Sequence, residues 1–360
     1  MDQDILKKIE EIVDAPGCYP ESARKPRDLR LREMTYWYEK YNEVNICYNL
    51  YGMDRAEVTD INQWLDRGLF RKQRHDANAA FYPDGSSFPY DYTLFMRDKH
   101  SFEMLMRSIH GNTDAYFRSY GLFEGGKLFS FSVDGSSKEI SVDTFIKEFS
   151  GTYVVFKNTF GCSGTGVVVA QVEDDKILYN SQTYTVEAFL DSLDKPKSNW
   201  LIQRFIEQHP TMKLFNDTSV NTMRIVTFNT GKRVVMATTA LRFGKPGSLA
   251  DNSDMGGLFT AIHDDGTVAN NMFSFIEKKR YPNPHAGTKI PFWDEVKKLT
   301  TYTHERIPEL FTIGWDVVIT PNGPMLLEGN DGWDPNLSQT PFGYGLRKTW
   351  DELLKERSEF

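Results

Sequence analysis

Residues 314–330, GWDVVITPNGPMLLEGN, contain the pattern that decides the fold of this chain. Two apolar runs flank the turn residues PNG at 321–323, which predicts a β-hairpin. We expect a three-residue loop, a type I turn closed by a left-handed glycine. In this register Thr320 lies opposite Pro324.

The same register places two carboxylates side by side. Asp316 lies opposite Glu328, and Asn330 shares the face of Glu328 because side chains alternate along a strand. A two-residue turn would put Asp316 on the other face. Paired carboxylates repel unless a cation or proton intervenes, and Mg²⁺ prefers oxygen ligands. Asp316, Glu328 and Asn330 are therefore predicted to bind magnesium with an anionic nucleotide, and a polar edge in solvent is the alternative.

Residues 152–168, TYVVFKNTFGCSGTGVV, predict a strand, a glycine-rich loop and a second strand. Glycines let backbone amides approach phosphate oxygens, and a lysine on a strand adds positive charge. The candidate phosphate contacts are Lys157, Gly161, Ser163, Gly164 and Gly166. The loop lacks the ending and the following helix of a Walker or Rossmann motif. A hairpin turn without a ligand is the alternative.

Residues 200–210, WLIQRFIEQHP, form an apolar strand that becomes polar at its end. Such a strand end offers a backbone amide and carbonyl to the edge of an adenine ring. The candidate adenine contacts are Gln203, Arg204, Phe205 and Ile206. Glu207 and His209 follow and are candidates for the ribose. For His209, a solvated position or a helix cap is the alternative.

Residues 219–227, SVNTMRIVT, place Arg224 on one face of a strand and Asn221 on the other. A buried arginine needs an anion, so Arg224 is predicted to meet the γ-phosphate or an acyl phosphate, with a structural salt bridge as the rival. Arg242, near the end of a later strand, invites the same interpretation. The loop after Arg242 is suited to shape a substrate pocket. The substrate candidates are Asn221, Asp251, Asn252, Gly256 and Gly257.

Composition limits the class of protein. With 360 residues, the chain exceeds the usual size of one hydrophobic core, so two or three lobes around a cleft are expected. Acidic residues outnumber basic ones by 50 to 42, which argues against a nucleic-acid partner. Three cysteines without metal-ligand spacing predict reduced thiols. No segment has the pattern of a secretion signal or membrane span, so a cytoplasmic location is expected.

Periodicity along the chain predicts an α+β protein. Helical spacing at residues 2–13, 28–48 and 59–74 precedes a loop-rich segment, and short β-rich runs dominate afterwards. The expected parts are a helical N-terminal region at 1–91, an α/β segment at 92–150, a lid with the glycine-rich loop at 151–206 and a C-terminal catalytic part at 207–360.

In this order, the pieces resemble the ATP-grasp superfamily, and particularly its sugar-transfer-associated branch, which is related to teichuronic-acid biosynthesis proteins. The resemblance covers residues 99–339 and is carried by KNTFGCSGTG, LIQRFIEQHP, SVNTMRIVT, DNSDMGG and GWDVVITPNGPMLLEGN. The chain departs from the pattern at Gln203, where many members carry glutamate.

The resemblance implies an ATP-grasp fold in which two α+β lobes sandwich ATP. It implies that Lys157 and Lys99 contact ATP, that the loop 161–166 is a mobile lid, and that Asp316, Glu328 and Asn330 hold one or two Mg²⁺ ions. Family members phosphorylate a substrate carboxylate with ATP, and an amine or other nucleophile then displaces phosphate from the acyl phosphate. Lys157, Arg224 and Arg242 are the candidate catalytic residues.

The expected partners are a small-molecule carboxylate and an amine or sugar acceptor, in cell-surface polysaccharide or amino-sugar biosynthesis. A kinase-type phosphotransferase and a non-catalytic nucleotide-binding scaffold are the alternatives. Acceptor contacts are expected in the aromatic N-terminal region and in residues 331–344, with Trp333, Asn336 and Gln339 as candidates.

Overall fold

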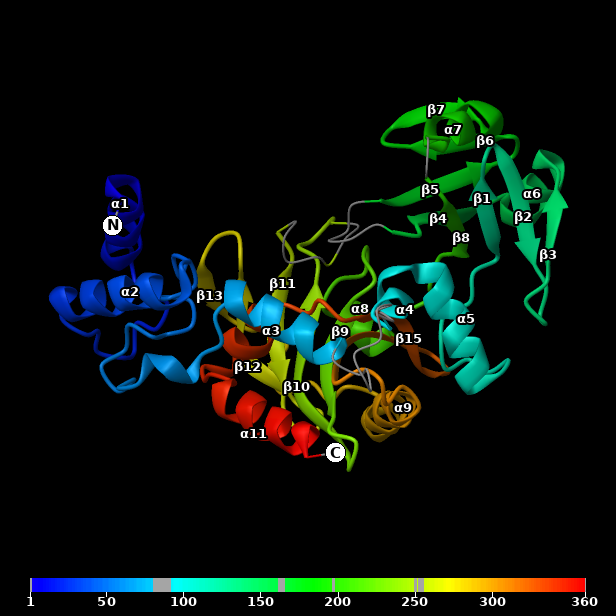
Figure 1. The fold of residues 1–360 in the computed structure, drawn as a ribbon. Coiled ribbons are helices and arrows are strands. Elements are labelled where there is room, and N and C mark those ends of the chain that lie inside the picture. The colour runs from blue at the N-terminus through cyan, green and yellow to red at the C-terminus, as the bar shows by residue number, and fades with distance from the viewer. Residues whose placement is uncertain are drawn as a thin grey trace.

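The computed structural model of the chain describes residues 2–79, 92–160, 166–195, 198–248, 251 and 256–359. Two antiparallel β-sheets, one of eight strands and one of seven, form two lobes. The seven-stranded sheet, called the larger sheet because its strands are longer, occupies the middle of the molecule, with the eight-stranded sheet on one side and the N-terminal helices on the other (Figure 1). This arrangement confirms the expected α+β class.

The smaller lobe comprises residues 121–204, and its strands are ordered β3-β2-β1-β8-β4-β5-β6-β7. The strands are β1 (Gly121–Glu124), β2 (Lys127–Phe131), β3 (Ser137–Ile140), β4 (Thr152–Asn158), β5 (Val167–Glu173), β6 (Lys176–Tyr179), β7 (Gln182–Thr185) and β8 (Trp200–Arg204). Helices α6 (Val142–Phe149) and α7 (Val186–Leu193) share a phenylalanine-rich core with the sheet. Because β1 pairs with β8, the expected boundary at residues 150 and 151 falls inside one sheet.

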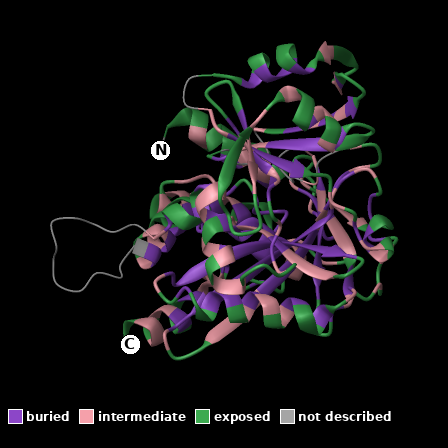
Figure 2. Ribbon diagram, turned by 90° about the vertical axis from the view of Figure 1, so that its right-hand side faces the viewer, coloured by how far each residue is buried: buried purple, intermediate pink, exposed green. Residues whose placement is uncertain are grey.

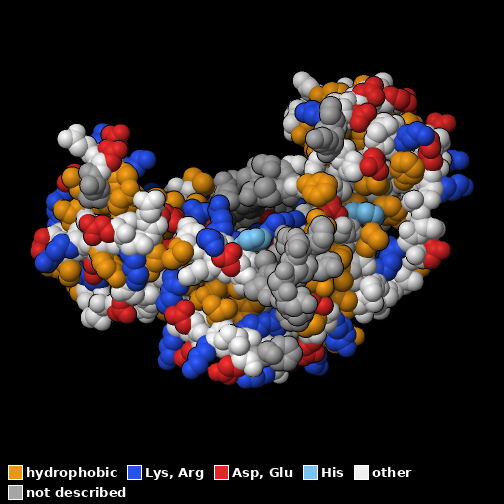
Figure 3. Space-filling view, in the orientation of Figure 1, with side chains coloured by type: hydrophobic (Ala, Val, Ile, Leu, Met, Phe, Trp, Pro, Cys, Tyr) orange, Lys and Arg blue, Asp and Glu red, His pale blue; other side chains and the backbone are white. Residues whose placement is uncertain are grey.

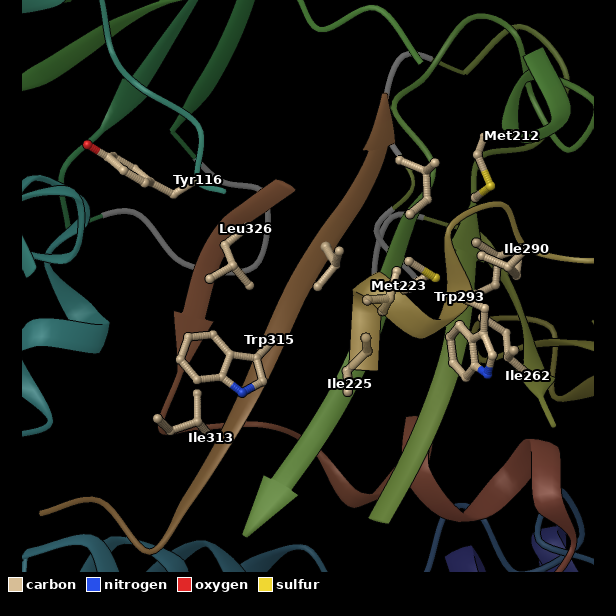
Figure 4. Packing of buried hydrophobic residues seen from close by; sticks show 14 of the residues in the cluster. Tyr116, Met212, Met223, Ile225, Ile262, Ile290, Trp293, Ile313, Trp315 and Leu326 are labelled. Carbon is tan, nitrogen blue, oxygen red and sulfur yellow. The ribbon is translucent and has the colours of Figure 1, made fainter. Parts of the chain in front are cut away.

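The larger lobe has the strand order β13-β12-β11-β10-β9-β14-β15. Its strands are β9 (Thr222–Asn229), β10 (Val234–Phe243), β11 (Leu258–Ile262), β12 (Val268–Ser274), β13 (Lys279–Pro282), β14 (Thr312–Thr320) and β15 (Gly323–Asn330). Trp293 of helix α9 (Trp293–Glu305) shares one buried apolar cluster with Ile225 and Trp315 of the sheet (Figure 4). Buried residues follow the strands of both sheets, whereas the outer faces of helices are exposed (Figure 2).

The expected helix at 2–13 is present as α1 (Gln3–Asp14), whereas the other two expected N-terminal helices have different bounds. The remaining elements are α2 (Arg27–Tyr41), η1 (Ile61–Gln63), α3 (Gly68–Ala79), α4 (Leu94–Arg97), α5 (Lys99–His110), α8 (Pro210–Lys213), α10 (Pro335–Gln339), η3 (Thr340–Phe342) and α11 (Arg347–Ser358). The expected helix 28–48 ends early because Asn42 is left-handed, with φ of +52°. The expected helix 59–74 begins late because Asp66 accepts hydrogen bonds from two amides of the first turn of α3.

None of the helices in the described parts of the chain is long and apolar enough to cross a membrane.

The hairpin of β14 and β15 has a different turn from the one expected, but it keeps the expected carboxylate pair. Thr320 pairs with Gly323, so the predicted three-residue loop is wrong and the loop has two residues. The Thr320 hydroxyl donates to the Gly323 carbonyl at 3.0 Å, which holds this tighter turn. Leu327 has no partner in the ladder, and this β-bulge restores Asp316 to its place opposite Glu328.

A buried polar network ties α9 to the larger sheet. Trp315 Nε1 donates to the Thr227 hydroxyl at 2.8 Å, and that hydroxyl lies 2.7 Å from His304 Nδ1. His304 Nε2 lies 3.0 Å from the Leu310 carbonyl oxygen. A neutral imidazole satisfies every partner, because Nδ1 accepts from Thr227 and Nε2–H donates to Leu310. Burial lowers the pKa of His304 to about 4.

We predict that His304 makes the stability of the protein depend on pH. Its pKa is about 4 in the folded chain and 6.5 when unperturbed, so the unfolded chain binds the proton first. The neutral, buried His304 contributes about 3 kcal/mol to the free energy of unfolding. This contribution is fully present above about pH 6.5 and is lost as the pH falls towards 4. The free energy of unfolding, measured by urea titration from pH 7 to 5, should fall less steeply in His304→Gln than in the wild type. The exposed His263 provides the control substitution His263→Gln, and equal slopes in all three proteins would contradict this role.

Candidate active site

A cleft of about 850 Å³ lies between the lobes and is lined by strands of both sheets. Figure 3 shows the molecule hollowed at this place, with lysine and arginine side chains in the hollow. Among the described residues, eight lysines and arginines and five acidic residues line the cleft. The chain as a whole has a net charge of −8. The cleft of this acidic protein is thus locally suited to anionic ligands, because a few cations are placed in it.

The base of the cleft carries the acidic residues of the hairpin. Asp316 Oδ1 accepts a hydrogen bond from Arg224 Nε at 2.6 Å, and Asp316 Oδ2 accepts one from Arg242 Nη2 at 2.9 Å. Glu328 Oε2 lies 4.0 Å from Lys99 Nζ. The Asn330 amide nitrogen donates to a backbone carbonyl of β14, which leaves its amide oxygen for a ligand. All six of these side chains line the cleft.

The opposite charges of Asp316, Arg224 and Arg242 stabilise one another in their ionised forms. Burial by itself raises the pKa of Asp316, but Arg224 and Arg242 together hold it well below its usual range. Burial by itself lowers the pKa of Arg242, but Asp316, Asp251 and Glu328 raise it overall. Asp316 and Arg242 are therefore charged, and together with Arg224 they form the Asp316 triad at the base of the cleft. The salt bridge that rivalled a phosphate contact for Arg224 is present in the structure.

The donor set fits magnesium only if other ligands complete it. Among the described residues, no group of three or more His, Cys, Asp and Glu side chains is arranged to hold a metal ion. Asp316 shares both oxygens with arginines, so Glu328 and Asn330 are the more available donors. Two carboxylates and an amide suit an ion that takes its remaining ligands from phosphate and water. The residues fit Mg²⁺ bound with a nucleotide better than a metal cage made by protein alone.

Two lysines reach the cleft from the side of the smaller lobe. Lys157, near the end of β4, is half-buried, and burial lowers its pKa while the charge of Glu328 opposes that change. No ion pair within 4 Å joins Lys157 to another described residue. Lys99 begins α5, and its backbone amide donates to Thr159 just beyond β4 at 3.0 Å. Gly166 lines the cleft with φ of +87°. Gly161, Ser163 and Gly164 lie outside the described residues.

The strand end predicted to meet adenine also lines the cleft, at Gln203, Arg204, Phe205 and Ile206. Gln203 Nε2 donates to Ser119 Oγ at 3.1 Å. The Arg204 side chain pairs with Glu148 of α6. Both side chains are held by contacts away from the cleft, so backbone groups of this segment are left to meet a ligand.

Several predicted residues do not line the cleft. Glu207 is exposed and lies 3.8 Å from Lys213. His209 Nδ1 accepts from the Thr211 amide at 3.1 Å and caps α8, which is the alternative stated for it. Asn221 is buried and donates to the carbonyls of Met212 in α8 and of Asn216, so its assignment to the substrate is not supported by its position.

In the predicted substrate loop and in the segment after β15, some of the predicted residues line the cleft and others do not. Asp251 lines the cleft and accepts from the Thr222 amide at 3.1 Å, whereas Gly256 and Gly257 do not line it. Asn252 lies outside the described residues. Among the acceptor candidates, Asn336 lines the cleft. Trp333 and Gln339 are fully buried, and their side chains hydrogen-bond within the larger lobe and to the segment before α3.

The sequence-based prediction missed the cations that the N-terminal region and α4 bring to the cleft. Arg67, Arg71 and Arg97 all line it. Arg67 pairs with Asp334 at 2.7 Å, and Arg97 pairs with Asp331 at 2.7 Å. The four-residue spacing of Arg67 and Arg71 was the available signal, since it places two cations on one helix face.

Comparison with solved structures gives distant likenesses. They include N5-carboxyaminoimidazole ribonucleotide synthetase from Thermotoga maritima (12% identity, TM-score 0.36, 67% of this chain and 43% of that one). D-alanine–D-alanine ligase from Bacillus anthracis also matches, at 12% identity and a TM-score of 0.36, over 74% of this chain and 67% of that one. L-amino acid ligase from Bacillus licheniformis matches at 11% identity and a TM-score of 0.36, over 68% of this chain and 43% of that one. The match thus spans less than half of two of these proteins. Identities and TM-scores this low identify neither a reaction nor a substrate.

No curated protein matches this sequence. The family model described as sugar-transfer associated ATP-grasp matches residues 87–354, about three quarters of the chain. This match confirms the resemblance carried by the motifs, and it agrees with two sheets that enclose a cationic cleft. The chain therefore belongs to the sugar-transfer associated ATP-grasp family.

Proposed function

We propose that this protein is an ATP-dependent carboxylate–amine ligase that forms an acyl phosphate and then an amide or related bond. The observation that carries the proposal is the cleft in which four cations, Lys99, Lys157, Arg224 and Arg242, surround the carboxylates of Asp316 and Glu328. A role in cell-surface polysaccharide or amino-sugar biosynthesis is part of the proposal and draws its support from the family description.

In this proposal, each wall of the cleft binds a different part of the nucleotide. Backbone groups of residues 203–206 bind adenine, because the Gln203 and Arg204 side chains are held elsewhere. Lys157 and Lys99 bind the phosphates. Glu328 and Asn330, with Asp316, hold Mg²⁺, which when bound neutralises phosphate charge.

The chain's own contribution is position and charge. The phosphoryl group moves from ATP to the substrate carboxylate, and the amine then displaces phosphate from the acyl group. Arg224 and Arg242 are held in place by Asp316, so they need little reorganisation to stabilise negative charge that develops nearby. Such positioned cations and aligned substrates supply most of the catalysis in phosphoryl transfer.

Product analysis tests this reaction class. The protein is incubated with Mg-ATP and pooled carboxylic acids and amines, and ADP, phosphate and condensed products are followed by mass spectrometry. A ligase releases ADP and phosphate together with a condensed product. ADP with a phosphorylated acceptor and no free phosphate would favour the kinase-type alternative, and nucleotide binding without turnover would favour a scaffold. Formation of AMP would contradict the proposed reaction.

We predict that Glu328→Gln lowers the rate of ADP release by about a hundredfold or more, because it removes a charged ligand of the metal. The side chain is 27% exposed and lies opposite Lys99 at 4.0 Å, so its amide analogue should fold normally. Initial rates of ADP release and thermal unfolding measure the two effects. Glu352→Gln makes the same chemical change on α11, where the side chain is 65% exposed, and should leave both unchanged. Wild-type turnover in Glu328→Gln would remove Glu328 from the metal site.

We predict that Lys157→Met weakens ATP binding by about tenfold or more without loss of stability. Lys157 is half-buried without an ion pair to a described residue, so methionine removes a desolvated charge while it keeps most of the side-chain length. Nucleotide titration followed by fluorescence, and thermal unfolding, measure both effects. Lys127→Met on β2, where the lysine is 58% exposed, is the matched control. A destabilised variant with normal ATP affinity would mean that Lys157 is structural.

A further inference from the structure

A row of cations forms the wall of the cleft on the side of α3. Arg67, Arg71 and His75 are spaced by four residues, so they share one face of the helix and its start. Arg67 and Arg71 line the cleft. Arg97 of α4 joins the row, with Nη2 at 3.3 Å from His75 Nδ1. These four side chains are separate from the lysines and arginines assigned above to ATP.

Two of the three arginines in the row are held by carboxylates, and the third is not. Asp334 pairs with Arg67 and Asp331 pairs with Arg97, both at 2.7 Å. Arg71 is exposed and pairs with no carboxylate among the described residues. The wall therefore has fixed geometry at Arg67 and Arg97, whereas the described part of the chain offers Arg71 no compensating carboxylate.

The wall adjoins the place where the proposed chemistry occurs. Asp331 follows Asn330 directly in the chain, and Asp334 is three residues further on, so the residues that hold the row continue from the predicted metal ligands. Phe275 lies under the Arg67 guanidinium at 5.6 Å and also lines the cleft, as does Asn336. Arg71 therefore differs from an arginine that only increases solubility, because it lines a cleft beside two arginines whose positions are fixed by ion pairs.

We propose that Arg71, flanked by Arg67 and Arg97, binds an anionic group of the non-nucleotide substrate, either a phosphate or a carboxylate. The inference rests on the proposed function, because the proposed function assigns the phosphates of ATP to Lys99 and Lys157 and so leaves Arg71 for the other substrate. The guanidinium fork suits both kinds of anion, since its donors match two oxygens at once. The substrate class is accordingly an acidic molecule whose charged group is held on the α3 side of the cleft.

Anion binding to the protein saturated with Mg²⁺ and the non-hydrolysable analogue AMP-PNP tests the inference. Inorganic phosphate and malonate are titrated separately by calorimetry, with the nucleotide site already filled. Wild-type protein should bind at least one of them, and Arg71→Ala should weaken that binding by about tenfold or more, with partial recovery in Arg71→Lys. The matched control is Lys72→Ala, which removes an equal charge from the adjacent residue, 73% exposed and paired with Asp76. It should bind the anion like the wild type.

Each outcome has a defined meaning. Preference for phosphate indicates a phosphorylated substrate, and preference for malonate indicates a polycarboxylate. The inference is overturned if neither anion binds the wild type or if Arg71→Ala binds as tightly as the wild type. Titration of AMP-PNP alone is done first, because its failure to bind would refute the proposed ATP site. In that case the anion titrations of the nucleotide-free protein still decide the role of Arg71.

Discussion

The carboxylate of Asp316 between Arg224 and Arg242 is the interaction on which the cleft depends. Three adjacent strands, β10, β9 and β14, each contribute one member, and Asp316 pairs directly with Arg224 in the sheet. Burying three charges carries a large desolvation penalty, which is offset only when their hydrogen bonds are made. Removal of one partner from such a group typically costs about 3–5 kcal/mol, because it leaves a charge buried without compensation. The triad therefore demands an accurate register from the strands that form the base of the cleft.

The larger sheet serves the core and the cleft at once because its side chains alternate. On β14, Trp315 and Val317 enter the apolar cluster shared with α9, while Asp316 between them lines the cleft. The bulge at Leu327 is what keeps this division consistent across the hairpin. Without an extra residue there, a two-residue turn would have turned Glu328 towards the core. The same alternation on β9 separates Arg224, which lines the cleft, from Met223 and Ile225, which enter the apolar cluster.

The remaining walls of the cleft come from segments far apart in the chain. The amide of Lys99 is bonded to Thr159 beyond β4, which brings the first lysine of the site close to the smaller lobe. A parallel bridge between Tyr116 and Leu326 attaches the segment before β1 to β15, and so connects the two lobes at the hairpin. Pairing of Arg97 with Asp331 adds a cation from α4 at the same end. These contacts concentrate positive charge in the cleft of an acidic protein.

The sequence by itself determined the features that depend on neighbouring residues. Strand parity separated Arg224 from Asn221, and the ordered motifs identified the family, because alternation and short motifs are local properties. Tertiary structure alone decided the tight turn and compensating bulge, the pairing of β1 with β8, and the meeting of Arg67 with Asp334. Those features join residues separated by up to some 270 positions, or depend on how a turn packs against its strands. Local patterns carry no information about such distant partners, since burial and pairing energies select them only when the whole chain folds.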